Sequence, residues 1–141
     1  MIPEGFSITN DETQLNIKAI HKYLSEESYW ARGRTIDDVT KSIKHSLCFG
    51  LFHGKIQVGF ARVVTDYTIF AWIMDVFILE KYKGLGLGYS LMNEIISHQE
   101  LKMIKRWGLN TRDAQSFYKK FGFRQLKNPQ YNMEKVDPEI L

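Results

Sequence analysis

The most constraining feature of this chain is an apolar run that passes directly into a glycine-rich turn and an amphipathic stretch. Residues 70–79 are almost wholly apolar and rich in β-branched and aromatic side chains, which is typical of a central strand covered on both faces. Glycines then occupy the alternate positions 84, 86 and 88, and residues 87–99 carry apolar side chains at helical spacing. The sequence therefore predicts a strand, a tight turn and a helix in one continuous unit.

Such a unit is typical of an anion site, most often one for phosphates. Glycine lacks Cβ and tolerates positive φ, so the backbone of the turn can approach a ligand closely. The helix that follows begins with unpaired N–H groups and the positive end of its dipole. The spacing does not fit a Walker loop, because no Lys-Ser/Thr pair follows the glycines. It does not fit a dinucleotide fingerprint either, because Gly88 comes one residue too soon.

Size and composition indicate one soluble domain. The 141 residues predict a single domain, 1–141, with one core. The net charge is only +3 and the basic residues are spread along the chain, so no dense nucleic-acid surface is expected. The single cysteine, Cys48, allows no internal disulfide and indicates a reducing compartment. No apolar run approaches the ~20 residues that cross a membrane. We therefore expect a cytoplasmic protein without nucleic-acid or membrane partners.

The remaining segments predict a mixed sheet flanked by helices. Strands are expected over residues 6–9, 47–52, 56–65, 70–79 and 106–111, with one or two more within 123–126 and 131–136. Capping signatures at Thr9 and Thr35 predict the first two helices, and Asp113 is the expected N-cap of the last. The predicted order is β-α-α-β-β-β-α-β-α-β, an α/β (α+β) fold.

Two segments resemble the GNAT superfamily of acyl-CoA-dependent N-acetyltransferases. The turn Lys83-Gly84-Leu85-Gly86-Leu87-Gly88 is similar to the pyrophosphate loop Arg/Gln-x-x-Gly-x-Gly/Ala, with Lys at the first position. Residues 111–123 resemble the segment Asn-x-x-Ala-x-x-x-Tyr-x-x-x-Gly-Phe, with Thr in place of Asn. The element order matches the GNAT fold, whose sheet is mostly antiparallel, over essentially the whole chain. Residues 59–66 also look like a subgroup of small bacterial GNAT proteins whose acceptors are not generally assigned.

The resemblance implies an N-acetyltransferase that uses acetyl-CoA as its acyl donor. It implies a bulge in the middle of the central strand, which frees a backbone N–H for the oxyanion, and pantetheine pairing beside that bulge. The cofactor-binding residues that it implies are Val76, Phe77, Ile78, Lys83, Gly84, Leu85, Gly86, Leu87, Gly88, Tyr89, Thr111, Ala114, Phe117 and Tyr118.

Two residues are candidates for catalysis. At pH 7 only about one alkylamine in 10³ is unprotonated, so a positioned base is useful. Asp75 is the candidate base because it interrupts the most apolar run of the chain; the alternative is a structural carboxylate satisfied by backbone donors or by Arg62. Tyr118 is the candidate acid for the departing thiolate, and the alternative is packing on a helical stripe with Ala114 and Phe117.

The acceptor is expected to be a small-molecule amine or a peptide amine. Tyr29 and Trp30, together with Asp75, are the expected acceptor-binding residues, because GNAT folds commonly build this wall between the first two helices; contact with the protein's own sheet is the alternative. Cys48 lies outside both motifs, which favours direct transfer in a ternary complex. The histidines show no metal-ligand spacing, so no metal is expected. Rival hypotheses are a catalytically silent acyl-CoA-binding or sensor module and a nucleic-acid-associated protein. A homodimer across the last strand is a further hypothesis.

Overall fold

The centre of the molecule is a five-stranded sheet in the order β1-β2-β3-β4-β5. The structure, a computed structural model, describes residues 2–138. Its strands are β1 (Phe6–Thr9), β2 (Leu47–His53), β3 (Ile56–Thr65), β4 (Phe70–Ile78) and β5 (Arg106–Leu109). The first four strands pair antiparallel and β5 joins β4 in parallel. The mixed, mostly antiparallel sheet predicted from the sequence is therefore confirmed.

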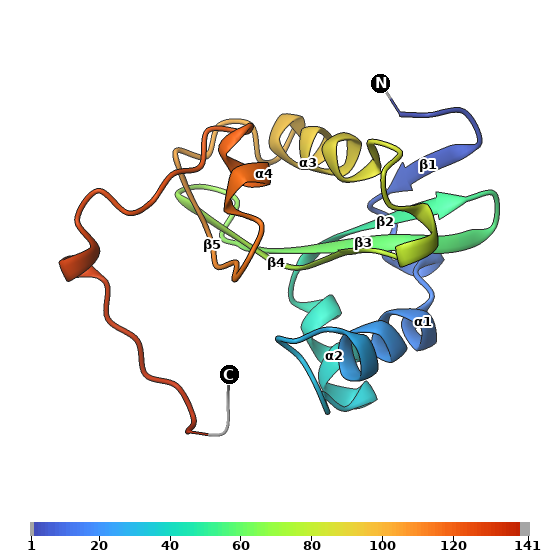
Figure 1. Cartoon of the computed structure of the whole chain (residues 1–141), viewed down its shortest axis with the longest axis horizontal. Helices are drawn as coiled ribbons and strands as arrows, with labels where there is room; N and C mark the ends of the chain where they lie inside the picture. The colour runs from blue at the N-terminus through green and yellow to red at the C-terminus, as the bar shows by residue number, and fades with distance from the viewer. Residues whose placement is uncertain (1, 139–141) are drawn as a thin grey trace.

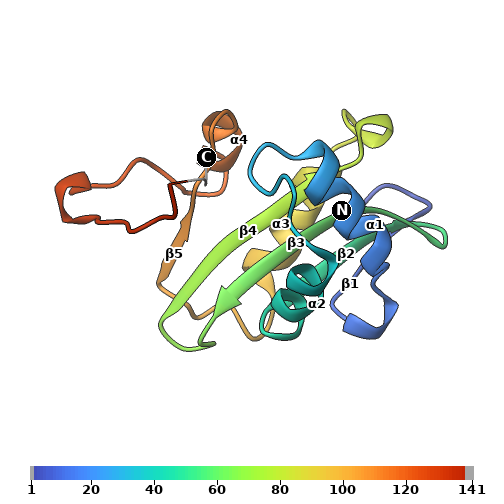
Figure 2. The same cartoon turned by 90° about the horizontal axis from the view of Figure 1, so that it is seen from below.

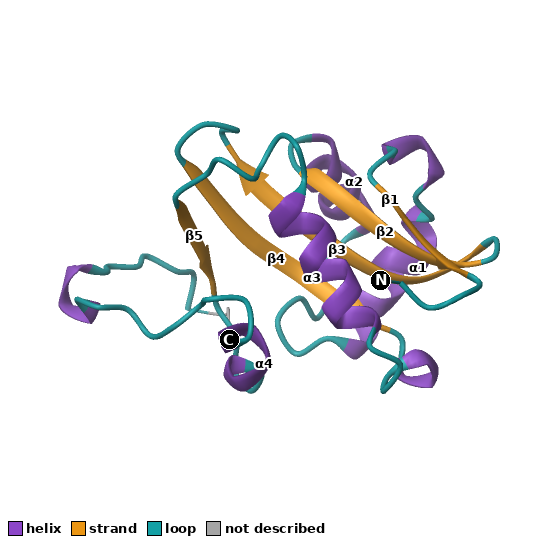
Figure 3. Ribbon diagram, turned by 90° about the horizontal axis from the view of Figure 1, so that it is seen from above, coloured by secondary structure: helices purple, strands orange, loops and turns teal. Residues whose placement is uncertain are grey.

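Helices cover both faces of the sheet (Figure 1). The first face carries α1 (Ile17–Lys22) and α2 (Ile36–Lys44), joined by the π-type turn η2 (Tyr23–Glu27) and a loop. The opposite face carries α3 (Leu87–Ser97) and the short α4 (Gln115–Lys119). Figure 2 shows α1 and α2 over the sheet from below, and Figure 3 shows α3 crossing it from above. The sheet is thus buried on both sides, as the apolar run of β4 requires.

Each face has its own apolar core. On the α3 side, Phe49, Ala61 and Ile73 of the sheet pack with Leu91 and Ile95 of the helix. On the other side the cluster of sheet and helix side chains consists of Phe60, Phe77, Leu24, Val39 and Ile43. The two cores fix the sheet between the helical layers, so groups at the middle of β4 have little freedom to move.

Local hydrogen bonds decide where the first two helices begin. Thr35 caps α2 as predicted, since its hydroxyl accepts from the amide of Asp38 at 3.1 Å. The capping box predicted at Thr9 is wrong: α1 begins later and is capped by Asn16. The reason is local competition, because Asp11 instead caps a short 3-10 turn over residues 12–14.

The strands predicted after α4 are not formed. Within residues 2–138 the chain has no strand beyond β5, and residues 123–138 contain only the 3-10 turn η4 (Pro129–Tyr131). In Figures 1 and 3 this segment leaves the body of the molecule after α4, extends outward to η4 and then turns back. A strand is stable only against a neighbouring ladder, and here the segment pairs with none. The strand predictions for 123–126 and 131–136 are therefore wrong for this structure.

Candidate active site

A β-bulge interrupts β4 at Asp75. Phe60 lies opposite Phe77 and Arg62 opposite Met74, so two steps along β3 match three steps along β4. Asp75 takes a φ of 55°, an uncommon value for a residue other than glycine. Both Met74 and Asp75 contact Arg62, whereas consecutive strand residues normally point to opposite faces. The bulge implied by the family resemblance is therefore present, and it turns the Asp75 side chain toward the α1 and α2 layer.

Beyond the bulge, one edge of β4 is open. β5 pairs only with Phe70–Ile73, and the strands separate after the Ile73–Leu109 pair. Among residues 2–138 no strand lies along the β5 side of Val76, Phe77 and Ile78. A sheet edge of this kind offers N–H and C=O groups to an extended ligand. The three residues predicted to pair with pantetheine thus lie on a free edge.

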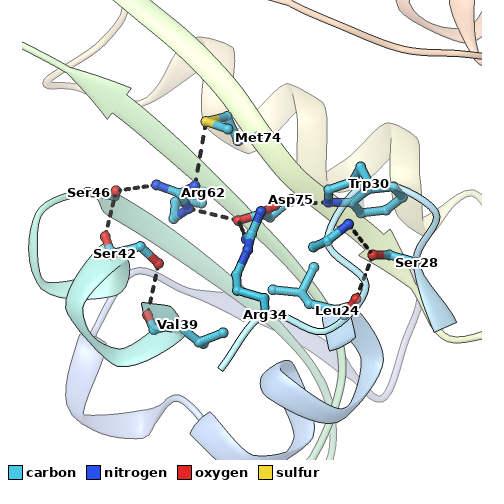
Figure 4. Close-up of polar contacts among 11 residues, drawn as sticks. Leu24, Ser28, Trp30, Arg34, Val39, Ser42, Ser46, Arg62, Met74 and Asp75 are labelled. Carbon is cyan, nitrogen blue, oxygen red and sulfur yellow. Dashed lines mark hydrogen bonds and ion pairs between the residues drawn. The ribbon is translucent and has the colours of Figure 1, made fainter. Parts of the chain in front are cut away.

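The Asp75 carboxylate, by contrast, is enclosed by donors (Figure 4). It accepts hydrogen bonds from Arg34 Nη1 at 2.8 Å, Arg62 Nε at 2.9 Å and Trp30 Nε1 at 2.9 Å. Its side chain is 1% exposed. Arg62 also donates to Ser46 Oγ at 3.1 Å, so the network reaches the end of α2. The contact between Asp75 and Arg62, which the sequence analysis gave as the alternative to a catalytic base, is present in the structure. The contact with Arg34 was not predicted, because Arg34 lies in a polar loop without periodicity.

The loop between η2 and α2 reaches across to the far side of the β4–β5 opening. Trp30 donates a hydrogen bond to Asp75. The adjacent residue Tyr29 packs edge-on against the Trp30 ring, with ring centroids 5.0 Å apart. The Tyr29 hydroxyl accepts from the backbone amide of Arg112 at 2.9 Å, and the Arg112 guanidinium lies 3.8 Å from the centroid of the Tyr29 ring. Both predicted acceptor residues therefore contact the protein itself, and Arg112 is a contact that sequence reasoning missed.

The glycine turn has the backbone conformation expected of an anion site. Gly84 and Gly86 have φ values of 83° and 77°, and no atom lies within 4 Å of a Cβ built at either position. Among residues 2–138 the amides of residues 84–89 donate to no other group. Gly86 is the N-cap of α3 and makes no side-chain cap, so the helix start is open. The turn presents unsatisfied donors at the positive end of a helix.

The other members of the turn divide into two groups. A Cβ at Gly88 would lie 3.4 Å from Cζ of Phe117, so this glycine allows α3 to pack against α4. Leu87 is buried in the core, whereas Leu85 and Tyr89 are exposed. Lys83 pairs with Glu80 at 2.9 Å, and this hydrogen bond raises the pKa of Lys83. The side chains of the turn thus hold the structure or face solvent, and the groups that it leaves without a partner among residues 2–138 are backbone amides.

Tyr118 and its neighbours lie on the other wall of the opening. The Tyr118 ring packs against Phe117 and Phe123, with centroid distances of 5.1 and 6.1 Å. Burial raises the pKa of Tyr118 to about 12, so the phenol keeps its proton at neutral pH. Within residues 2–138 its hydroxyl makes no hydrogen bond. The prediction that Asp113 caps the last helix is wrong, because the N-cap of α4 is Ala114 and no side chain caps that helix. Thr111 accepts from the amide of Ala114 at 3.0 Å in the turn that precedes it.

Metal-ligand clusters and membrane-spanning helices are absent from residues 2–138. No group of three or more His, Cys, Asp or Glu side chains in the described part of the chain is arranged to hold a metal ion. None of the helices in residues 2–138 combines the length and the apolar character that crossing a bilayer requires.

A family model described as an acetyltransferase (GNAT) domain matches residues 44–125, which include the bulge, the glycine turn and Tyr118. The chain belongs to the GNAT family. As a member of that family it is an acyltransferase. Its fold matches the crystal structure of a GNAT protein from Xanthomonas campestris pv. campestris with a TM-score of 0.94 and 38% identity, over 98% of this chain and 96% of that one.

Curated relatives agree with this assignment. A Gibberella zeae protein described as an acetyltransferase is 26% identical over 64% of this chain, and the chain spans 64% of that relative's length. The spermine/spermidine N(1)-acetyltransferase of Bacillus subtilis is 28% identical, with 89% of this GNAT chain and 91% of that protein covered. An Elizabethkingia anophelis GNAT acetyltransferase, 15% identical with a TM-score of 0.66 over 98% of this chain and 92% of that one, has acetyl-CoA bound in its crystal structure.

Proposed function

We propose that this protein transfers an acetyl group from acetyl-CoA to a primary amine by direct transfer in a ternary complex. The observation that carries the proposal is the set of unsatisfied amides at residues 84–89, next to the open edge of β4. The first N–H groups of a helix have no partner within the helix, and a row of them that follows a glycine turn is typical of phosphate binding. The open space where a Cβ would stand at Gly84 and Gly86 gives a pyrophosphate room to approach.

The residues fit acetyl-CoA in order along the opening. The turn amides would hold the pyrophosphate, and the backbone of Val76, Phe77 and Ile78 would pair with the pantetheine chain. When bound, acetyl-CoA supplies an activated thioester carbonyl. The bulge at Asp75 breaks the ladder with β3 and redirects backbone N–H groups, which is the geometry needed to hold the oxygen of that carbonyl.

Tyr118 is proposed as the proton donor. In the transfer a C–N bond forms to the amine, the C–S bond breaks, and the thiolate accepts a proton. Burial, which raises the pKa of Tyr118 to about 12, keeps the phenolic proton in place over the whole neutral range. The amine loses its own proton to solvent, from which the phenolate recovers one. Tyr118 is half-buried at the wall of the opening, with its hydroxyl making no hydrogen bond within residues 2–138.

Two observations refine the mechanism. Burial raises the pKa of Cys48 to about 12, and the thiol is 4% exposed, so it is unsuited to a covalent acetyl-enzyme. The Asp75 oxygens already accept from two arginines and one indole, which favours its structural alternative over the role of base. We propose that Asp75 positions the Trp30–Arg34 loop and stabilises the bulge.

The charge of the ion pairs in this region bears on the acceptor. These pairs contain three arginines, Arg34, Arg62 and Arg112, and two carboxylates, Asp75 and Asp113, an excess of one positive charge. A polyamine, the substrate of the Bacillus subtilis relative, is not complementary to such a surface. We propose an acceptor that carries an anionic group, such as a carboxylate, beside its amine. The expected assay result is faster acetylation of amino acids than of spermidine.

The function is tested by following release of free CoA thiol from acetyl-CoA with a panel of amines. Turnover that requires an amine and yields an N-acetyl product by mass spectrometry supports the proposal. The Asp75 oxygens already accept hydrogen bonds from protein donors, which leaves the site without a free carboxylate base. This observation favours one alternative function, a catalytically silent acyl-CoA-binding module. That alternative predicts CoA binding with no amine-dependent thiol release across amino acids, peptides and polyamines.

A further inference from the structure

The contact between Tyr29 and Arg112 crosses the β4–β5 opening. Tyr29 precedes Trp30, which donates to Asp75 at the bulge, whereas Arg112 follows the end of β5. The Tyr29 hydroxyl accepts from the Arg112 amide at 2.9 Å, and the Arg112 guanidinium lies over the Tyr29 ring, 3.8 Å from its centroid. The two contacts hold a positive charge beside the opening.

This charge lies close to the groups of the proposed transfer. Burial raises the pKa of Tyr118 to about 12, and the Tyr29 phenol adds to that rise. Because electrostatic effects between side chains weaken with distance, the two phenols lie near each other. On its other side Tyr29 packs against Trp30, whose indole donates to Asp75 at 2.9 Å (Figure 4). Arg112 therefore borders the region between the bulge and the proposed proton donor.

The other cations of this region already have firm partners. Arg34 and Arg62 donate to the same oxygen of Asp75 at 2.8 and 2.9 Å, and their side chains are only 22% and 10% exposed. Moving either guanidinium to a ligand would weaken the pairing of a buried carboxylate, which is costly. Lys83 is paired with Glu80 beside the glycine turn. None of the three is well placed to bind an acceptor.

Arg112 differs from them because most of its donors are unused. Its side chain is 64% exposed, and among residues 2–138 its guanidinium donates one hydrogen bond, from Nη2 to Asp113 Oδ2 at 3.2 Å. Both side chains of this ion pair are exposed, so the pair contributes little to stability. A guanidinium has five N–H donors, so four remain for a ligand. The Tyr29 ring restrains the planar group without using any of them.

We propose that Arg112 binds the carboxylate of the acceptor and thereby selects α-amino acids as acetyl acceptors. The inference rests on the proposed acetyl transfer and names the residue that determines its acceptor. A guanidinium and a carboxylate fit each other through two parallel N–H···O bonds, which are charge-assisted and strong. In an α-amino acid one carbon carries both the carboxylate and the amine, so a carboxylate held by Arg112 keeps the amine beside the opening.

The bond changes are those of the proposed transfer, and Arg112 takes no part in them. The C–N bond forms to the α-nitrogen, the C–S bond breaks, and Tyr118 protonates the thiolate. The product is an N-acetyl amino acid. A polyamine presents only cationic groups to Arg112, so the same residue disfavours it.

The test compares acceptors that differ only in the carboxylate. The protein amino acids and their α-amides are assayed by release of CoA thiol and by the mass of the N-acetyl product. Arg112→Met keeps an unbranched side chain and removes the charge, so KM for the amino acids should rise at least about tenfold with kcat within about twofold. KM for the uncharged amides should change by less than about threefold. Each variant is compared with the wild type on the same acceptor, so the different amine pKa values of acid and amide cancel.

Two further variants serve as controls. Lys102→Met removes an exposed positive charge in the loop before β5, at the other end of that strand from Arg112, and should leave both KM values unchanged. Arg112→Lys keeps the charge but loses the forked donor, so it should recover part of the affinity for amino acids. An equal rise in KM for acids and amides, or no rise for either, would overturn the proposal.

Binding without turnover separates this inference from the proposed function. Protein saturated with CoA, which has no acetyl group to transfer, is titrated with the amino acids in a calorimeter. Their Kd should rise at least about tenfold in Arg112→Met and stay the same in Lys102→Met. Binding that depends on Arg112, without acetylation of any amine, would support the carboxylate site and refute the proposed function. Acetylation that Arg112→Met leaves unchanged would refute the carboxylate site alone.

Discussion

The bulge at Asp75 and the glycine turn lie at opposite ends of one short stretch of chain, yet they treat their polar groups in opposite ways. At the bulge both oxygens of a buried carboxylate accept hydrogen bonds from protein donors: Arg34, Arg62 and Trp30. At the turn the amides of residues 84–89 have no acceptor within the described residues, and the space beside Gly84 and Gly86 is open.

The difference separates structural from ligand-binding groups. A buried group whose partners are all internal stabilises the fold, since removing one partner leaves another charge uncompensated. Donors that lack internal partners are satisfied by water or by a ligand, and their affinity is available for binding. On this basis we propose that the bulge shapes the site and that the turn binds the anionic part of the donor.

The largest effect on stability is expected from removing the charge of Asp75 at the bulge. Asp75→Asn leaves the buried Arg62 and the partly buried Arg34 without a counter-ion, so the free energy of unfolding should fall by about 3–5 kcal/mol in urea titrations. The control Asp113→Asn removes an exposed ion pair and should change it by less than about 0.5 kcal/mol.

A double variant sharpens this test. If Asp75 is structural, adding Arg34→Met to Asp75→Asn removes one orphaned charge and should restore at least about 1 kcal/mol. If Asp75 is instead the base, Asp75→Asn would keep its stability and lose turnover. That second result would contradict the contrast between the two regions.

Gly86→Val tests the glycine turn. The φ of 77° is strained for a β-branched residue, and the new side chain fills the space beside the turn amides. CoA affinity should fall at least about a hundredfold, or about 2.7 kcal/mol, in calorimetric titration. Gly54→Val is a matched control, because Gly54 has a φ of 62° with open space in the distant β2–β3 turn. Unchanged CoA binding in Gly86→Val would show that the turn is only structural.

Tyr118→Phe tests the proposed proton donor, which lies beside the β4–β5 opening. Loss of the proton donor should lower kcat about a hundredfold and leave the Kd for CoA within twofold, because the ring is retained. The exposed Tyr67→Phe, in the turn between β3 and β4, is the control and should change neither. An equal loss of kcat and affinity would mean that Tyr118 only packs.

The pH–rate profile of the wild-type protein tests the protonation state of Tyr118. Since burial raises the pKa of Tyr118 to about 12, its protonated form persists through neutral and mildly alkaline pH. Activity should rise as the amine deprotonates and show no fall from this group below about pH 11. A descending limb near pH 8–9 that disappears in Tyr118→Phe would contradict the burial argument.

The smallest effect is expected at Lys83. Its ammonium pairs with Glu80, and its side chain is 55% exposed. If backbone amides dominate the anion site, Lys83→Ala should weaken CoA binding by no more than about fivefold, and the loss should shrink in high salt. A hundredfold loss would transfer the anion-binding role from the amides to this side chain.

Sequence reasoning succeeded where the determinants are local. The strand, turn and helix over residues 70–97 follow from periodicity and glycine placement, and the Thr35 cap from a four-residue signature. The partnership of Asp75 with Arg62 was weighed as an alternative, because a carboxylate in an apolar strand requires a donor.

It failed where the determinants are distant or shared between elements. Arg34 reaches Asp75 from 41 residues away, and nothing in its own loop signals that contact. The change of face at the bulge depends on a mismatch between β3 and β4, which composition does not encode. The strands at 123–126 and 131–136 were predicted from propensity alone. A strand also needs a neighbouring strand to pair with, and residues 123–138 pair with none.

The most direct test of the central claim is calorimetric titration of the full chain with acetyl-CoA, CoA and ATP in parallel. The open turn and the free edge of β4 predict micromolar binding of both CoA species at one site per chain. ATP, which shares the adenine and phosphates but lacks pantetheine, should show no binding at the same concentrations. If neither CoA species binds, the unsatisfied amides do not form a cofactor site, and the proposed function is wrong.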